Sequence, residues 1–292
     1  MKNFQAGILA PVPAQARYLT FTLRAGAQPR RALNRLAGLV NGESCVAGIG
    51  LPLLRALNRT IPGMRRFPSY ARQGARVPST PAAVWCWLRG ADRGELILRS
   101  QAIERVLAPA FRLDSAIDAF RHGTGRDLTG YEDGTENPKS VKAVAAAIGG
   151  GAGAGLDGSS FVSTQLWVHD FDRFNAMRSH AQDNAIGRRR RDNVELAYAP
   201  ASAHVKRTAQ ESFRPEAFVV RRSMPWNDAT RAGLVFVAFG QTPDAFEAQL
   251  KRMAGAEDGI VDALFKFTQP VTGCHFWCPP VARGRLDLRA LG

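Results

Sequence analysis

The sequence predicts an α+β fold of two ferredoxin-like (βαββαβ) domains, with antiparallel sheets packed against helices. Strand-like apolar runs, each followed by a helix-like amphipathic segment, recur four times in the 292 residues. These units start at residues 18 and 84, then at 164 and 234, so their spacing is 66 and 70 residues. A glycine-rich joint at 149–155 separates the halves. We expect an N-terminal domain over residues 1–148 and a C-terminal domain over 156–292.

The elements of the N-terminal half follow from apolar patterning and from helix-start signals. A strand is predicted at Tyr18–Leu23, and Pro29 then opens an amphipathic helix over Arg30–Val40. A second unit pairs a strand at Val84–Leu88 with a helix at Glu95–Leu107. Two further strands complete the βαββαβ pattern, at Val46–Gly50 and Phe111–Phe120.

The C-terminal half repeats this order. A strand at Thr164–His169 precedes helices at Phe171–Met177 and Ser179–Gly187, and a strand at Leu234–Phe239 precedes a helix at Pro243–Met253. Extra strands are predicted at Phe218–Met224 and Cys274–Trp277. No GxGxxG segment follows the first strand, which disfavours a doubly wound nucleotide-binding fold.

Composition narrows the functional class. The hydrophobic fraction of 45% suits a globular core, and four cysteines are too few for a disulfide framework. The N-terminus lacks a secretory signal and no apolar run could span a membrane, so a cytoplasmic protein is expected. A net charge of +14 suits anionic partners. The run Arg188–Arg191 is interpreted as a solvated loop, since no nucleic-acid-binding motif accompanies it and we expect no specific nucleic acid.

The most informative motif is Gly130–Pro138, which sets Asp133 between Gly130 and Gly134. The glycines allow a tight bend, and Pro138 can open a helix. As GxxDG alone the motif also fits a polar turn. Over its nine residues it resembles the signature of the dye-decolorising peroxidases, and the chain is most similar to their bacterial, cytoplasmic B-type members. Members of that family have two ferredoxin-like domains, with haem held mainly by the second.

The resemblance implies a set of haem-site residues. His204, in Ala203–Arg207, is similar to the family's axial ligand, a role that spacing alone does not assign. Arg221, in Val219–Trp226, is similar to the distal arginine, with Arg222 as the local alternative. Asp262 corresponds to the carboxylate behind the axial histidine. Further haem contacts are expected from the distal strand and from the motif, at Leu234, Phe236, Gly134 and Thr135.

The implied function is a haem-dependent peroxidase that carries one haem b per chain. It would reduce hydrogen peroxide and oxidise dyes or phenolic and other organic reductants, with Asp133 and Arg221 as catalytic residues. Because Asp133 would act as a base and then as an acid, an acidic optimum is expected. A homo-oligomer is also expected. The alternatives are a haem-handling protein with incidental peroxidase activity and a basic nucleic-acid-binding module. The tail Val281–Gly292 fits a docking peptide or a frayed end, and the frayed end is favoured.

Overall fold

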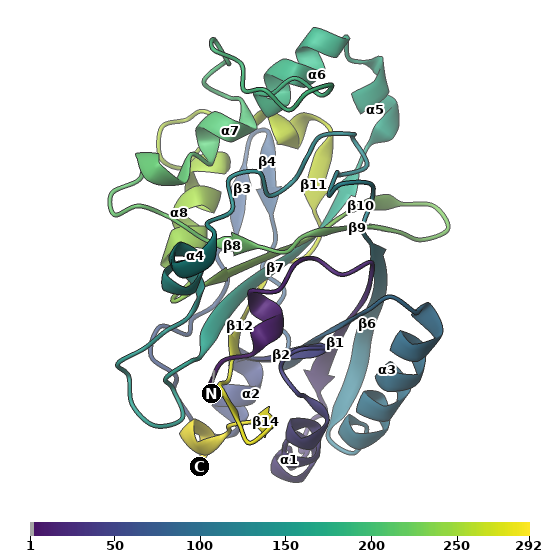
Figure 1. The fold of residues 1–292 in the computed structure, drawn as a ribbon, viewed down its shortest axis with the longest axis vertical. Coiled ribbons are helices and arrows are strands. Elements are labelled where there is room, and N and C mark those ends of the chain that lie inside the picture. Colours follow the sequence, from purple (N-terminus) through teal and green to yellow (C-terminus); the bar gives the residue numbers. More distant parts are fainter. Residues whose placement is uncertain (1–2) are drawn as a thin grey trace.

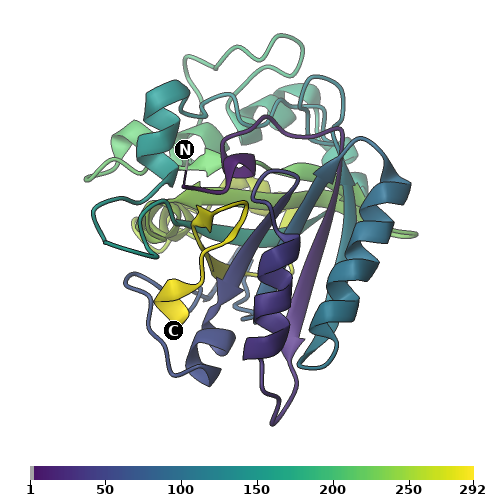
Figure 2. The same cartoon turned by 60° about the horizontal axis from the view of Figure 1, so that its bottom comes forward.

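The computed structural model describes residues 3–292. In the N-terminal half, four antiparallel strands lie in the order β2-β5-β1-β6, and α1 and α3 lie against one face of them (Figures 1 and 2). The bounds are β1 Gln15–Leu23, α1 Arg30–Leu39, β2 Cys45–Gly50, α2 Leu51–Ala56, β3 Tyr70–Arg72, β4 Ala75–Val77, β5 Val84–Gly90, α3 Arg93–Leu107 and β6 Phe111–Phe120. A short 3-10 helix, η1, precedes them at Ala6–Ile8.

In the C-terminal half, the antiparallel order is β12-β7-β10-β9, with β11 and β8 at the margins. The strands are β7 Ser160–His169, β8 Val220–Arg221, β9 Met224–Asn227, β10 Ala232–Gly240, β11 Thr268–Pro270, β12 Cys274–Cys278, β13 Val281–Ala282 and β14 Arg285–Leu286. The helices are α4 Ser140–Ala147, α5 Phe171–Ala176, α6 Ser179–Ile186, α7 His204–Arg207, α8 Asp244–Met253, η2 Gln210–Ser212, η3 Ala263–Lys266 and η4 Arg289–Leu291. Within residues 3–292, no helix is long and apolar enough to cross a bilayer.

The two halves are joined edge to edge. Strand β12 pairs with β2, and β6 meets β9 at Ala119 and Trp226, so eight strands form a closed ring. An aromatic core that includes Trp85, Trp87 and Phe239 fills the ring. Alternate residues of β5 face the other way, into a second core beneath α1 and α3. Strand β5 is therefore buried on both faces, which explains its unbroken apolar run.

The expected Phe218–Met224 strand is instead divided into β8 and β9. The Arg222 guanidinium donates to the carbonyls of Arg221 and Leu9, and the Arg222 backbone amide donates to Val237. Ser223 then faces the Val237 amide at 3.4 Å from its hydroxyl. These contacts interrupt the regular strand at residues 222–223. As a result, the side chains of Arg221 and Arg222 lie in different parts of the molecule.

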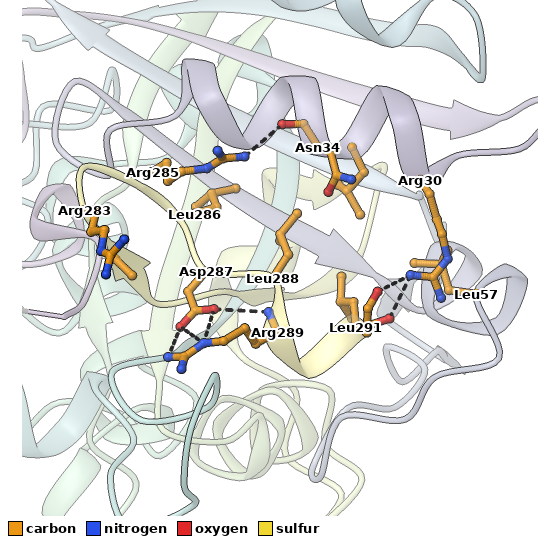
Figure 3. Close-up of a pocket in the computed structure, with 13 residues that line it drawn as sticks. Arg30, Asn34, Leu57, Arg283, Arg285, Leu286, Asp287, Leu288, Arg289 and Leu291 are labelled. Carbon is orange, nitrogen blue, oxygen red and sulfur yellow. Dashed lines mark hydrogen bonds and ion pairs between the residues drawn. The ribbon is translucent and has the colours of Figure 1, made fainter.

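The prediction of a frayed tail is wrong. Leu286 and Leu291 are only 3% and 2% exposed, because they join the core that α1 and Leu57 also line. Arg59 donates to the Leu291 carbonyl at 3.0 Å. Asp287 pairs with Arg289 at 2.7 Å (Figure 3). The apolar spacing of Leu286, Leu288 and Leu291 therefore reflects packing against the N-terminal half.

Candidate active site

A cavity of about 880 Å³, its open mouth included, lies among the 127–133 loop, β7, β10, α7 and α8. Of this space, about 120 Å³ can hold the centre of a water molecule. Most of its wall is apolar, and it includes Trp167, Ile186, Leu234, Phe236, Phe246, Leu250, Met253, Leu264 and Phe267. Its carboxylate, imidazole and guanidinium side chains are Asp127, Glu132, Asp133, His169, His204 and Arg221. The C-terminal half therefore contributes most of the wall, and the Gly130–Pro138 motif contributes a polar edge.

His204 opens α7 and faces the cavity. Its Nδ1 lies 2.8 Å from Asp262 Oδ2, and the other carboxylate oxygen of Asp262 accepts the Leu264 amide at 2.9 Å. Asp262 is 1% exposed and lies behind the ring rather than in the cavity wall. Because the Asp262 carboxylate accepts a hydrogen bond from Nδ1–H, Nε2 carries the free electron pair of the neutral ring. Among residues 3–292 no hydrogen-bond partner is found for Nε2, which fits an imidazole that binds a metal.

The Val205 side chain of α7 packs directly against the backbone of Gly187. Gly187 ends α6 with φ of 94°, and a Cβ at this position would come within 2.3 Å of Val205 Cγ2. Only glycine allows both the left-handed conformation and this contact. The residue after the α6 helix therefore sets how closely the His204 segment packs.

Asp133 and Arg221 meet on the cavity wall, with Oδ1 and Nη1 3.7 Å apart. Asn137 joins the motif to the arginine: its Oδ1 accepts the Arg221 amide at 2.7 Å, and its Nδ2 donates to the Arg221 carbonyl at 3.1 Å. Gly134 has φ of 73°, and a Cβ there would come within 2.7 Å of Asn137 Nδ2. The glycine and asparagine of the motif thus hold the carboxylate and the guanidinium together.

Of the three carboxylates in the wall, Asp133 is the most loosely held. Asp127 lies 2.9 Å from His169 Nε2 and also accepts from Thr129. Glu132 accepts from Arg126 at 2.8 Å and from Thr124 at 2.6 Å. Among residues 3–292, Asp133 accepts only the next backbone amide, that of Gly134, besides its long approach to Arg221. Of the three, Asp133 is therefore the carboxylate with the fewest hydrogen-bond partners within the described chain.

His169 and Asp127 are site residues that the sequence interpretation did not identify. Thr268 Oγ1 lies 2.7 Å from His169 Nδ1 and donates to the Val168 carbonyl. Burial opposes ionisation of Asp127, but hydrogen bonds from His169 and Thr129 dominate and hold its pKa below the usual range. A polar histidine ending the apolar strand β7 was the one available signal, because its partner Asp127 lies far away in sequence.

The structure separates the two candidate arginines. Arg221 lines the cavity, whereas Arg222 points to η1, where burial and then the Arg89 charge lower the pKa of Arg222 to about 10. Thr135 lies outside the cavity wall, and its hydroxyl accepts from Asn193 at 2.9 Å. Gly134 lines an adjoining chamber that shares Asp133 and Arg221 with the cavity. The exposed Arg121 and His122 also line this chamber.

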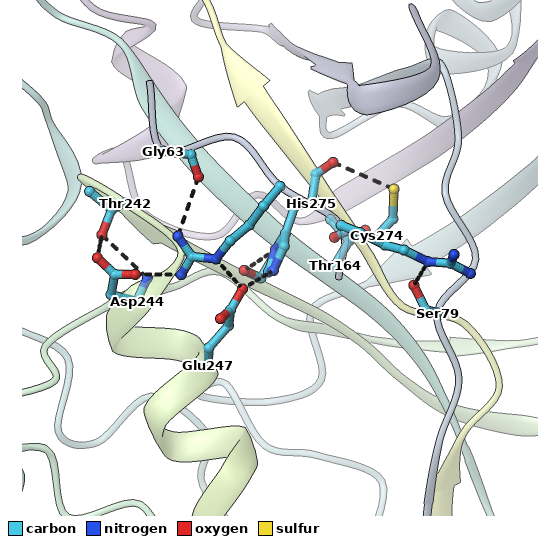
Figure 4. A network of polar contacts seen from close by, with 11 residues as sticks. Gly63, Ser79, Thr164, Thr242, Asp244, Glu247, Cys274 and His275 are labelled. Carbon is cyan, nitrogen blue, oxygen red and sulfur yellow. Dashed lines mark hydrogen bonds and ion pairs between the residues drawn. The ribbon is translucent and has the colours of Figure 1, made fainter. Parts of the chain in front are cut away.

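Helix α8, which carries Phe246 and Leu250 of the wall, is anchored by a partly buried polar network (Figure 4). Glu247 lies 3.0 Å from His275 Nε2 and 2.9 Å from Arg65 Nε. His275 Nδ1 lies 2.9 Å from the Ser163 hydroxyl. Burial lowers the pKa of His275 despite the opposing Glu247 carboxylate, so the neutral ring donates to Glu247 and accepts from Ser163.

Comparison with known proteins points to one family. The family model "Dyp-type peroxidase, C-terminal" matches residues 124–283. The chain is 29% identical to a dye-decolorizing peroxidase of Mycolicibacterium paratuberculosis, over 94% of this chain and 83% of the relative. Its identity to the Mycobacterium tuberculosis relative of that name is 28%, over 94% and 88%.

Solved structures share the fold. A dye-decolorizing protein from V. cholerae is 28% identical, with a TM-score of 0.84 over 94% of this chain and 96% of that one. A variant of DypB from Rhodococcus jostii RHA1, solved in complex with heme, has a TM-score of 0.86 at 23% identity, over 93% and 94%. The mixed arrangement of helices and antiparallel sheets is thus that of Dyp proteins.

Proposed function

The chain belongs to the Dyp-type peroxidase family, and we propose that His204, Asp133 and Arg221 are the working residues of its haem site. The protein is a haem peroxidase of the dye-decolorising type. The observation that supports the site assignment best is one cavity with the Asp262-backed His204 and the Asp133–Arg221 pair all in its wall.

Haem b, one per chain, is the cofactor that these residues suit. His204 Nε2 would bind the iron, while Asp262 fixes the ring and makes it a stronger donor. Leu234 and Phe236 offer the apolar surface that a porphyrin requires. Haem supplies an iron centre that accepts the oxidising equivalents of hydrogen peroxide.

The chain's own residues would handle protons and charge. Asp133 takes a proton from one peroxide oxygen and returns it to the other, which leaves as water. Arg221 stabilises the negative charge that develops as the O–O bond breaks, and it stays charged at any working pH. Asn137 keeps the arginine in place from the motif side. Organic reductants, including dyes and phenols, then supply the electrons.

We infer two ferredoxin-like halves, over residues 1–148 and 156–292, with haem held mainly by the second. The strand orders β2-β5-β1-β6 and β12-β7-β10-β9 support this, because both place the first strand between the third and the fourth. A B-type affiliation, a cytoplasmic location and a homo-oligomer are also proposed. Buried free cysteines at all four positions suit a reducing compartment.

Reconstitution with hemin, followed by peroxide and dye, tests the function. We expect a Soret band and catalytic dye oxidation from the wild-type protein. A protein that binds hemin and releases iron or haem, with dye oxidation no faster than free hemin, would instead indicate a haem-handling role. Size-exclusion chromatography with light scattering tests the homo-oligomer, and an elution at 31.7 kDa would contradict it.

A further inference from the structure

Helix α7, which begins with His204, is a single turn of four residues that lies beside α8 (Figure 1). Its own hydrogen bonds cannot hold so short a helix in place, because isolated helices of fewer than about 12 residues are marginal in water. The position of His204 must therefore come from tertiary contacts of the turn. Arg207, at the other end of the turn, makes such contacts.

The Arg207 guanidinium joins α7 to the end of α8 and to the loop that follows it. Nη1 and Nη2 donate to the two carboxylate oxygens of Asp258 at 2.8 and 2.7 Å, which is the bidentate geometry of strong arginine–carboxylate pairs. Nη2 also donates to the Arg252 carbonyl at 2.8 Å. Arg207 is 4% exposed but does not line the cavity, so it acts from behind the site.

The segments 202–207 and 258–263 run past each other in opposite directions. Hydrogen bonds and an ion pair join them in order along the two segments, at Ser202–Ala263, His204–Asp262 and Arg207–Asp258. The contact between His204 and Asp262 therefore lies between a backbone hydrogen bond on one side and the Arg207 ion pair on the other. Partly buried ion pairs of this kind are best known for fixing the register of two segments rather than for adding stability.

Asp258 is tied to the loop that ends at Asp262. Its Oδ1 accepts the Ile260 amide at 3.0 Å, and the loop closes where the Asp262 amide donates to the Met253 carbonyl at 2.8 Å. The hydrogen bond from Arg207 is the main reason that the pKa of Asp258 lies below its usual range, so the carboxylate stays ionised and paired. A displacement of Asp258 would therefore move the loop that carries Asp262.

We propose that Arg207 is a positioning residue of the haem site, which acts through Asp258 to keep the Asp262 carboxylate in contact with His204. A hydrogen bond from a ligating imidazole to a carboxylate makes the imidazole a stronger donor, and a stronger donor favours ferric over ferrous iron. Loss of the Arg207 bridge lets the two segments separate and weakens this effect. The proposal rests on the proposed function, in which His204 binds the haem iron.

The reduction potential of bound hemin separates this positioning role from a simple effect of charge. Arg207→Gln removes a positive charge, which by itself stabilises ferric iron and lowers the potential. Weaker donation by His204 acts in the opposite direction. We expect Arg207→Gln to shift the equilibrium about tenfold toward ferrous iron, which raises the potential by about 59 mV.

Lys206→Gln is the matched control for this measurement. It removes the same charge from the same turn, at a partly exposed side chain that pairs with Glu195 at 3.3 Å. The control should not raise the potential. A potential that is unchanged or lower in Arg207→Gln, or one that rises equally in Lys206→Gln, would overturn the proposal.

A double-mutant cycle tests whether Arg207 acts through Asp262. Asp262→Asn should raise the potential at least as much as Arg207→Gln does. Arg207→Gln should then cause no further rise when it is added to Asp262→Asn, because the carboxylate through which it acts is gone. Equal rises in the two backgrounds would contradict a role through Asp262.

Resonance Raman spectra of the ferrous, hemin-loaded protein give a second readout. The iron–histidine stretching band should move to lower frequency in Arg207→Gln and in Asp258→Asn, and it should stay in place in Lys206→Gln. Asp258→Asn breaks the same bridge from its partly exposed end, so it decides the matter if Arg207→Gln does not fold. A band that does not move in Asp258→Asn would overturn the proposal. Wild-type protein that binds hemin without an iron–histidine band would instead refute the proposed function.

Discussion

Replacement of Asn137 by alanine tests how the motif positions the distal arginine. The change removes two hydrogen bonds to the Arg221 backbone, at 2.7 and 3.1 Å, and leaves its amide without that acceptor. An unsatisfied buried amide costs about 1–3 kcal/mol. A shift of about 1 Å in a catalytic group can cost about 100-fold in rate. We therefore expect Asn137→Ala to slow the reaction of hemin-loaded enzyme with peroxide by about 10- to 100-fold.

Stopped-flow absorbance at the Soret band measures this rate directly. Asn193→Gly is the matched control, because Asn193 also binds the motif but through the exposed Thr135 hydroxyl, and glycine tolerates its φ of 58°. It should leave the rate within about twofold and the melting temperature nearly unchanged, as exposed contacts contribute little. If Asn137→Ala reacts as fast as wild type, or if both variants slow equally, the positioning argument fails.

Three further predictions follow from the same contacts. Asp133→Ala and Arg221→Leu should each slow the peroxide reaction by about 100-fold or more while hemin still binds, and wild-type rates in both would refute the assignment. Because burial depresses the pKa of His275, its contribution to stability is complete above the unfolded value of about 6.5 and declines as pH falls below it. His275→Gln should therefore flatten the decline in melting temperature between about pH 7 and pH 5, whereas parallel curves would contradict this. Leu291→Ala, at a site 2% exposed, should lower the free energy of unfolding by about 2–5 kcal/mol in urea melts, and no loss would mean that the tail does not pack.

The sequence predicted those helices and strands whose signals lie within a single short segment of the chain. Strand β6 has the predicted bounds, and α8 starts one residue later than predicted, because each has a clear apolar pattern and a turn or proline at its start. The β3–β4 hairpin was not predicted, since the Arg- and Pro-rich stretch around Tyr70 shows no alternation. Closure of the ring through β12 and β2 depends on pairing between distant segments, which periodicity within a segment does not encode.

The residues of the candidate site likewise divide into those that the sequence identified and those that depend on long-range contacts. The resemblance placed His204, Asp133 and Arg221, and the fold brings all three to one cavity. Arg221 and Arg222 lie in different surroundings because the strand is interrupted between β8 and β9. At this interruption, Arg222 and Ser223 form hydrogen bonds with Val237 of β10. The His169–Asp127 pair depends on the loop before the motif folding onto the end of β7. Side chains that acquire their roles through such long-range contacts cannot be found by reading along the chain.

The central claim is that His204 binds the haem iron, and imidazole rescue of a cavity variant tests it most directly. In His204→Gly, the visible and electron paramagnetic resonance spectra of bound hemin should lose the wild-type histidine-ligated form, and added imidazole should restore it. His180→Gly, at an exposed histidine of α6, should keep the wild-type spectra without imidazole. Wild-type spectra in His204→Gly would contradict the account.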